Sequence, residues 1–89
     1  MSSAKTTTNH DEIRRWAEKR GGHPARVEGT EILRIDFNEP GGDDDDRLER
    51  IDWNEFFRVF DSRGLAFLYD AEGDSRFNKF VSKETADNR

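Results

Sequence analysis

Cysteine is absent from this chain of 89 residues, which excludes disulfide bonds, thiolate metal sites and cysteine catalysis. Long apolar runs are also absent, and no stretch approaches the roughly 18 apolar residues of a membrane-spanning helix. Residues 1–9 are too polar for a signal peptide. From these absences we expect a cytoplasmic protein that has no membrane partner.

Hydrophobic residues are scarce, at 31% against 39% charged residues, and this balance favours disorder. The apolar residues are nevertheless large and grouped, because they include seven Phe, two Trp and one Tyr. Each aromatic side chain buries a large area, so a small number of them can supply a core. We therefore predict one compact domain over residues 9–83, with residues 1–8 and 84–89 as disordered tails.

Charge is unevenly distributed along the chain, whose net charge is −5. Residues 1–34 carry seven basic against five acidic side chains, residues 35–62 carry three against ten, and residues 63–89 carry five of each. A general nucleic-acid binder is usually basic, so the total charge argues against that function. The weakly basic first segment leaves it open as an alternative.

Two amphipathic helices are predicted, and each begins with the residue spacing of a capping box. Asn9 with Glu12 begins the first helix, and Asp52 with Glu55 begins the second. The apolar stripes of the two helices are Ile13, Trp16 and Ala17, and Trp53, Phe56, Phe57 and Phe60. Glycine follows each stripe and ends the helix, because it adopts the left-handed conformation without a steric penalty.

Four extended segments complete the predicted fold, at residues 24–28, 31–37, 65–69 and 76–81, and a further short extended piece is expected at residues 48–51. Apolar and polar residues alternate in the second of them, as in a half-buried strand, except at Ile32. The predicted order is αββαββ, an α+β fold in which both helices pack on one face of a mainly antiparallel sheet. Residues 39–46, rich in Gly and Asp, are expected to form a mobile loop.

The two halves of the sequence resemble each other. An offset of 43 pairs Arg20 with Arg63, and one inserted residue later Gly29 pairs with Gly73. An internal duplication explains this pattern, and so does the coincidence of two capped helices that are each followed by a glycine turn. The sequence alone does not decide between the two.

Four stretches resemble a family of small uncharacterised bacterial proteins, and the resemblance covers most of residues 9–83. These stretches are IRRWAEKRGGHPA at 13–25, IDWNEFF at 51–57, LAFLY at 65–69 and SRFNKFV at 75–81. The resemblance implies a compact bacterial domain and assigns no functional residue. Some members carry the name of glucan-branching enzymes, but such enzymes resemble glycosidases that place their carboxylates in a large barrel, which 89 residues cannot build.

Candidate catalytic and metal-binding residues are few. His10 and His23 are the only histidines, and both are predicted to be solvated at the surface. The run from Asp43 to Asp46 offers oxygen ligands to Ca²⁺ or Mg²⁺, but it lacks the spacing that wraps a cation, so a solvated loop is favoured. We therefore predict a protein that is not an enzyme and has no cofactor or metal.

One candidate surface for contacting a partner is basic, and it consists of Arg14, Arg15, Lys19, Arg20 and Arg26. If these side chains converge, together with Arg76 and Lys79 near the C-terminus, they would grip phosphates. The interleaved acidic residues favour ordinary ion pairs on a helix surface instead. We favour a non-enzymatic protein-interaction module, with a nucleic-acid-associated module that uses the first helix as the alternative.

Overall fold

The computed structural model describes residues 4–37 and 47–84. The elements follow in the order β1 (Ala4–Thr7), α1 (His10–Lys19), β2 (His23–Val27), β3 (Leu33–Asp36), β4 (Leu48–Arg50), α2 (Trp53–Ser62), β5 (Leu65–Asp70) and β6 (Asn78–Ser82). The prediction of a disordered tail is wrong for residues 4–7, which form β1. Most of the other segments expected to be mobile, namely 1–3, 39–46 and 85–89, lie outside the described residues.

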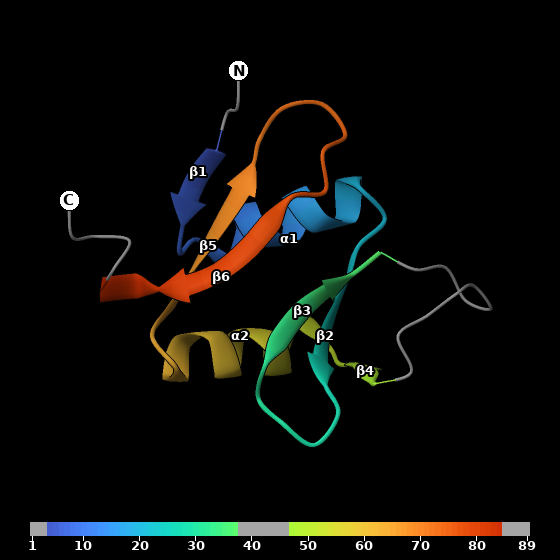
Figure 1. Ribbon diagram of the computed structural model, residues 1–89, viewed down its shortest axis with the longest axis vertical. Helices are drawn as coiled ribbons and strands as arrows, with labels where there is room; N and C mark the ends of the chain where they lie inside the picture. Colours follow the sequence, from blue (N-terminus) through green and yellow to red (C-terminus); the bar gives the residue numbers. More distant parts are fainter. Residues whose placement is uncertain (1–3, 38–46, 85–89) are drawn as a thin grey trace.

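Two antiparallel three-stranded sheets form the framework, with strand orders β1-β5-β6 and β3-β2-β4 (Figure 1). The α+β class is confirmed. The predicted αββαββ order and single sheet are wrong, because a strand also precedes each helix and the six strands divide between two sheets. In the described part of the chain, no helix is long and apolar enough to cross a membrane.

The two halves share one topology, a strand followed by a helix and then two strands. The first strand of each half pairs with the other half: β1 pairs with β5, and β4 pairs with β2. Helix α2 contacts β2, β3 and β5, so it bridges the two sheets. The halves are therefore interlocked, and neither sheet is complete without a strand from the other half.

The helices begin and end where the sequence predicts. The side-chain oxygen of Asn9 accepts a hydrogen bond from the backbone N–H of Glu12 at 2.9 Å, and Asp52 accepts one from Glu55 at 2.7 Å. The glycine that follows each C-terminal cap has a positive φ, 74° at Gly21 and 61° in the second half. These helix ends follow from local chemistry alone.

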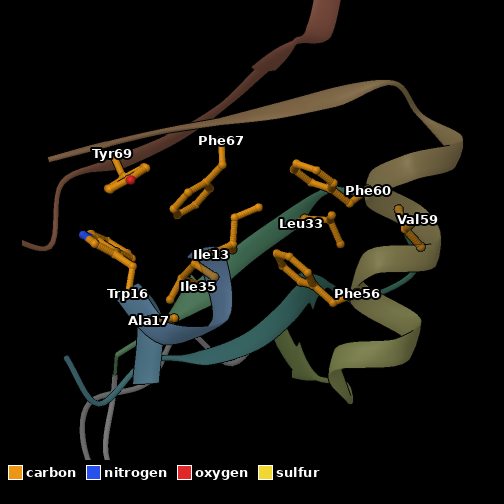
Figure 2. Close-up of a cluster of buried hydrophobic side chains, with 10 residues drawn as sticks. All are labelled: Ile13, Trp16, Ala17, Leu33, Ile35, Phe56, Val59, Phe60, Phe67 and Tyr69. Carbon is orange, nitrogen blue, oxygen red and sulfur yellow. The ribbon is translucent and has the colours of Figure 1, made fainter. Parts of the chain in front are cut away.

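The core lies between the helices and the two sheets (Figure 2). Its ten buried residues are Ile13, Trp16, Ala17, Leu33, Ile35, Phe56, Val59, Phe60, Phe67 and Tyr69. The prediction that Trp16 is a core residue is confirmed, since it is 6% exposed, whereas Trp53 is only partly buried and packs at the edge of the cluster. Aromatic rings from both helices and from β5 thus compensate for the low hydrophobic content, while β3 contributes Leu33 and Ile35.

A part-buried polar contact joins three elements beside this core. The hydroxyl groups of Tyr69 and Thr7 donate to the two carboxylate oxygens of Glu12, the second at 3.1 Å. The Glu12 side chain therefore links β1, α1 and β5, and in the described contacts it does not complete the reciprocal half of the capping box. Burial, followed by the Glu12 contact, raises the pKa of Tyr69 to about 12.

This raised pKa predicts a loss of stability at high pH. Because the folded-state pKa of Tyr69 lies above the unfolded value of about 10, its stabilising contribution is full below pH 10 and disappears as the pH rises through 12. The contribution is on the order of 2–3 kcal/mol. Urea unfolding of the parent and of Tyr69→Phe, from pH 8 to 12, should show their difference in unfolding free energy shrinking above pH 10. A difference that does not change with pH would contradict this assignment.

Candidate functional site

The five basic residues singled out from the sequence do not form one surface. Arg14, Arg15 and Lys19 lie exposed on α1, and Arg14 forms the predicted ion pair with Glu18 at 3.1 Å. Arg15 does not pair with a carboxylate in the described contacts, and its Nε donates to the backbone carbonyl of Asp11 at 3.3 Å. The remaining two arginines have structural partners elsewhere.

Arg20 is buried, with 8% of its surface exposed. Its Nε donates to the carbonyl of Ser75 at 2.6 Å, and its Nη2 donates to the carbonyl of Gly73 at 2.8 Å. Its Nη1 donates to the carbonyl of Trp16 at 3.1 Å, and the guanidinium lies over the indole ring at 4.6 Å from the centroid. Arg20 therefore fastens the loop between β5 and β6 to the C-terminal end of α1.

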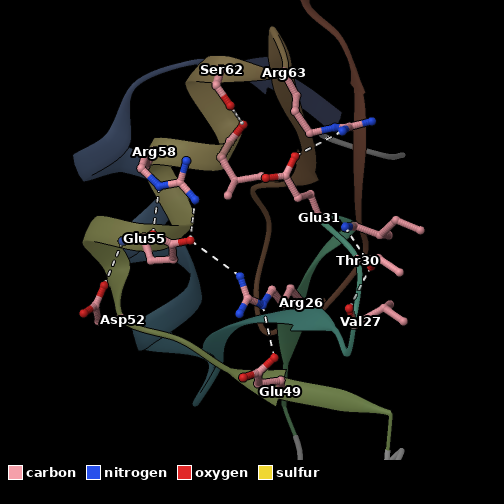
Figure 3. A network of polar contacts seen from close by, with 12 residues as sticks. Arg26, Val27, Thr30, Glu31, Glu49, Asp52, Glu55, Arg58, Ser62 and Arg63 are labelled. Carbon is pink, nitrogen blue, oxygen red and sulfur yellow. Dashed lines mark hydrogen bonds and ion pairs between the residues drawn. The ribbon is translucent and has the colours of Figure 1, made fainter.

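Arg26 belongs to an ion-pair network on the sheet formed by β3, β2 and β4 (Figure 3). From β2 it contacts Glu49 at 3.1 Å and Glu55 at 3.5 Å, and Glu55 also accepts a hydrogen bond from Arg58 at 2.8 Å. This hydrogen bond from Arg58 is the main cause that lowers the pKa of the Glu55 carboxyl. Arg26 therefore ties β2 to β4 and α2, and it does not extend the basic surface of α1.

Of the two histidines, His10 has a structural role that the sequence did not predict. Its ring stacks on Phe57 at 4.1 Å between centroids, and its Nε2 lies 2.9 Å from a carboxylate oxygen of Asp61, so it connects α1 to α2. His23 lies exposed in β2. Among the described residues, no group of three or more His, Asp or Glu side chains is placed to hold a metal ion, and the run from Asp43 to Asp46 lies outside those residues.

A groove lies between β3 and β6, which are edge strands of the two sheets. It has a volume of about 190 Å³ and is lined by Glu31, Ile32, Leu33, Arg34, Arg63, Leu65 and Phe80. Ile32 is 47% exposed, and Leu65 and Phe80 are partly buried where they pack against the core. We refer to this feature as the edge groove.

The pairing register shows which backbone groups of β3 and β6 point away from their neighbouring strands. Backbone hydrogen bonds join Gly64 to Lys83 and Asp70 to Phe77. In an antiparallel pair the hydrogen-bonded positions alternate along each strand. The other positions of β6 therefore have N–H and C=O groups that point away from β5, and these positions are Asn78, Phe80 and Ser82. By the same alternation, the backbone groups of Leu33 and Ile35 point away from β2. Leu33 and Phe80, which line the edge groove, therefore combine apolar side chains with backbone groups that point away from the neighbouring strand.

Sequence reasoning missed this groove. It is formed by two edges that come from different sheets, and the prediction contained only one sheet. The one signal in the sequence was Ile32, which breaks the alternation of its segment and proves to be exposed.

No match to this chain is found among protein-family profiles, curated proteins or solved structures. The resemblance to small bacterial proteins remains a prediction.

Proposed function

We propose that this domain is a non-enzymatic protein-interaction module that binds an extended segment of a partner protein in the edge groove. The observation that carries the proposal is the set of outward-pointing backbone groups on β3 and β6, which have no partner strand on that side among residues 4–37 and 47–84. We also propose that it acts in the cytoplasm, which the lack of cysteine favours.

Addition of a strand to a sheet edge is an established form of peptide recognition. The backbone hydrogen bonds supply affinity, and alternate side chains of the peptide enter pockets that supply specificity. Here Leu33, Leu65 and Phe80 provide apolar surface in the groove for such side chains. Arg34 donates to the outward carbonyl of Leu33 at 2.9 Å, a contact that would have to be exchanged on binding.

The nucleic-acid alternative has less support. Phosphate binding along a duplex or a single strand needs several cations on one surface. Arg20 is buried against loop carbonyls, and Arg26 is paired with acidic residues of β4 and α2. The net charge of −5 also opposes association with a polyanion.

A matched pair of variants tests the proposal. Ile32 and Phe77 are exposed to almost the same extent, 47% and 46%, but only Ile32 lines the edge groove. Immobilised parent, Ile32→Asp and Phe77→Asp are exposed to lysate of the native cell, after circular dichroism has verified that all three are folded. The proteins captured by the parent should stay with Phe77→Asp and be lost with Ile32→Asp, because a carboxylate in the groove must be desolvated. Capture that survives Ile32→Asp unchanged would exclude the groove.

A further inference from the structure

A second hollow, separate from the edge groove, lies where the end of α1 meets the loop between β5 and β6. It has a volume of about 280 Å³ and is lined by Lys19, Arg20, Asp74 and Arg76. Two of these cations, Lys19 and Arg20, come from the first half of the chain, and Arg76 comes from the second. The fold thus brings together basic residues that lie far apart in the sequence.

The two guanidinium groups are held in place before any ligand arrives. Three carbonyls fix Arg20, which leaves further N–H groups of its guanidinium without a protein acceptor in the described contacts. The guanidinium of Arg76 lies over the ring of Phe37, at 5.2 Å from its centroid. Because Arg20 is only 8% exposed, a ligand would meet mainly the exposed side chains of Arg76 and Lys19, with the remaining N–H groups of Arg20 as a third, fixed contact.

The cations that line this hollow outnumber its carboxylates. Three cations face one carboxylate, and none of the three has a carboxylate at ion-pair distance among the described residues. The carbonyls of residues 16–18 at the C-terminal end of α1 accept hydrogen bonds from N–H groups of Arg20, Gly21 and Gly22. An excess of positive charge in a protein of net charge −5 favours an anionic ligand at this point.

We propose that this hollow binds a single phosphate monoester group carried on a protein side chain. A dianion with several acceptor oxygens matches one exposed guanidinium, one ammonium group and the remaining N–H groups of Arg20 better than a single carboxylate does. The small size of the cluster suits one phosphoryl group, whereas nucleic acid needs a longer row of cations. The proposal does not depend on the edge groove, and either site can fail without the other.

The test is a titration of the ¹⁵N-labelled domain with a capped phosphoserine tripeptide, compared with its unphosphorylated form and with a short single-stranded oligonucleotide. The phosphopeptide should move the amide signals of Lys19, Asp74 and Arg76 and saturate on the order of millimolar, a range expected for one anion. The unphosphorylated peptide should move none of them. Stronger binding of the oligonucleotide at the same signals would overturn the proposal in favour of nucleic acid.

Three variants make the test specific, and Arg20 is left intact in all of them because of its structural contacts. Lys19→Ala combined with Arg76→Ala should weaken phosphopeptide binding by about tenfold or more, since both cations are removed. Asp74→Asn should tighten it by a few fold, because a like charge beside the phosphate disappears. The control, Arg14→Ala combined with Arg15→Ala, removes the same formal charge from the exposed face of α1 and should have little effect. Equal weakening by both double variants, or no tightening by Asp74→Asn, would show that only general attraction is present.

Discussion

Truncation of Phe56 or Phe60 to alanine is expected to leave the domain barely folded. Both rings are essentially inaccessible, at 0% and 1% exposed, and they contact each other as well as Phe80 of the facing sheet. Removing a buried ring from a small core costs about 3–5 kcal/mol. A domain of this size has a total stability of about 5–8 kcal/mol, so either variant should lose most of it, as measured by urea unfolding.

Phe57 supplies the control for this prediction. It lies on the same helix but is only partly buried, and it stacks on His10 at the margin of the core. Phe57→Ala should therefore cost clearly less than either core truncation. If Phe60→Ala instead melts within a few degrees of the parent, the aromatic stripe of α2 is not the core of this domain.

Replacement of Arg20 by methionine is expected to destabilise the domain by about 2–4 kcal/mol, the second large effect. The change preserves an apolar stem but removes three charge-assisted hydrogen bonds, and it leaves loop carbonyls in a part-buried environment without their donor. The contact with the ring of Trp16 also disappears. Urea unfolding measures the loss, and the amides of Gly73 and Ser75 should exchange faster with solvent, because the loop is released from α1.

Arg63 is the matched control, since it holds the equivalent C-terminal cap of α2. Its side chain is about half exposed and makes a longer contact with Glu31 at 3.4 Å. Arg63→Met should cost no more than about 0.5 kcal/mol, as is usual for an exposed ion pair. Equal losses of unfolding free energy in the two variants would mean that the cap position determines the effect, and not the three carbonyl contacts of Arg20.

The local elements were predictable from the sequence because their signals are local. The capping residues Asn9 and Asp52 satisfy backbone donors three residues away, and the apolar stripes of both helices follow the helical period. The core positions of Phe56 and Phe60 followed from the same periodicity. Each of these features depends on neighbours along the chain, so no knowledge of the topology was needed.

The strand β1 was not predictable in the same way. Its residues Ala4–Thr7 are mostly exposed and polar, so they show no alternation of apolar side chains. The strand exists because its backbone pairs with β5, from Ala4 with Asp70 to Thr7 with Phe67. The exchange of first strands between the halves, and hence the division into two sheets, depends on pairing across 60–66 residues for β1 with β5 and across 21–25 residues for β4 with β2. The shared topology agrees with the repeat at offsets of 43 and 44, and it extends that repeat to β1 and β4.

The candidate sites were only partly predictable for a related reason. The sequence identifies Arg20 as basic, but nothing local indicates that loop carbonyls from residues 73 and 75 will surround it. The edge groove depends on two strand edges that face each other, and the pairing register determines which backbone groups face outward. Tertiary arrangement therefore decides both sites, while the residue types were visible from the start.

The central claim, that a partner adds a strand at the edge groove, is tested most directly by amide hydrogen exchange with and without the captured partner. In the free domain the amides of Lys79 and Val81 should be protected by β5, while those of Asn78 and Phe80 exchange rapidly. The account predicts that the amides of Asn78 and Phe80 become protected in the complex, because their N–H groups then donate to the partner's backbone. A stable complex in which Asn78 and Phe80 exchange as fast as before, with new protection confined to other surfaces such as α1, would contradict it.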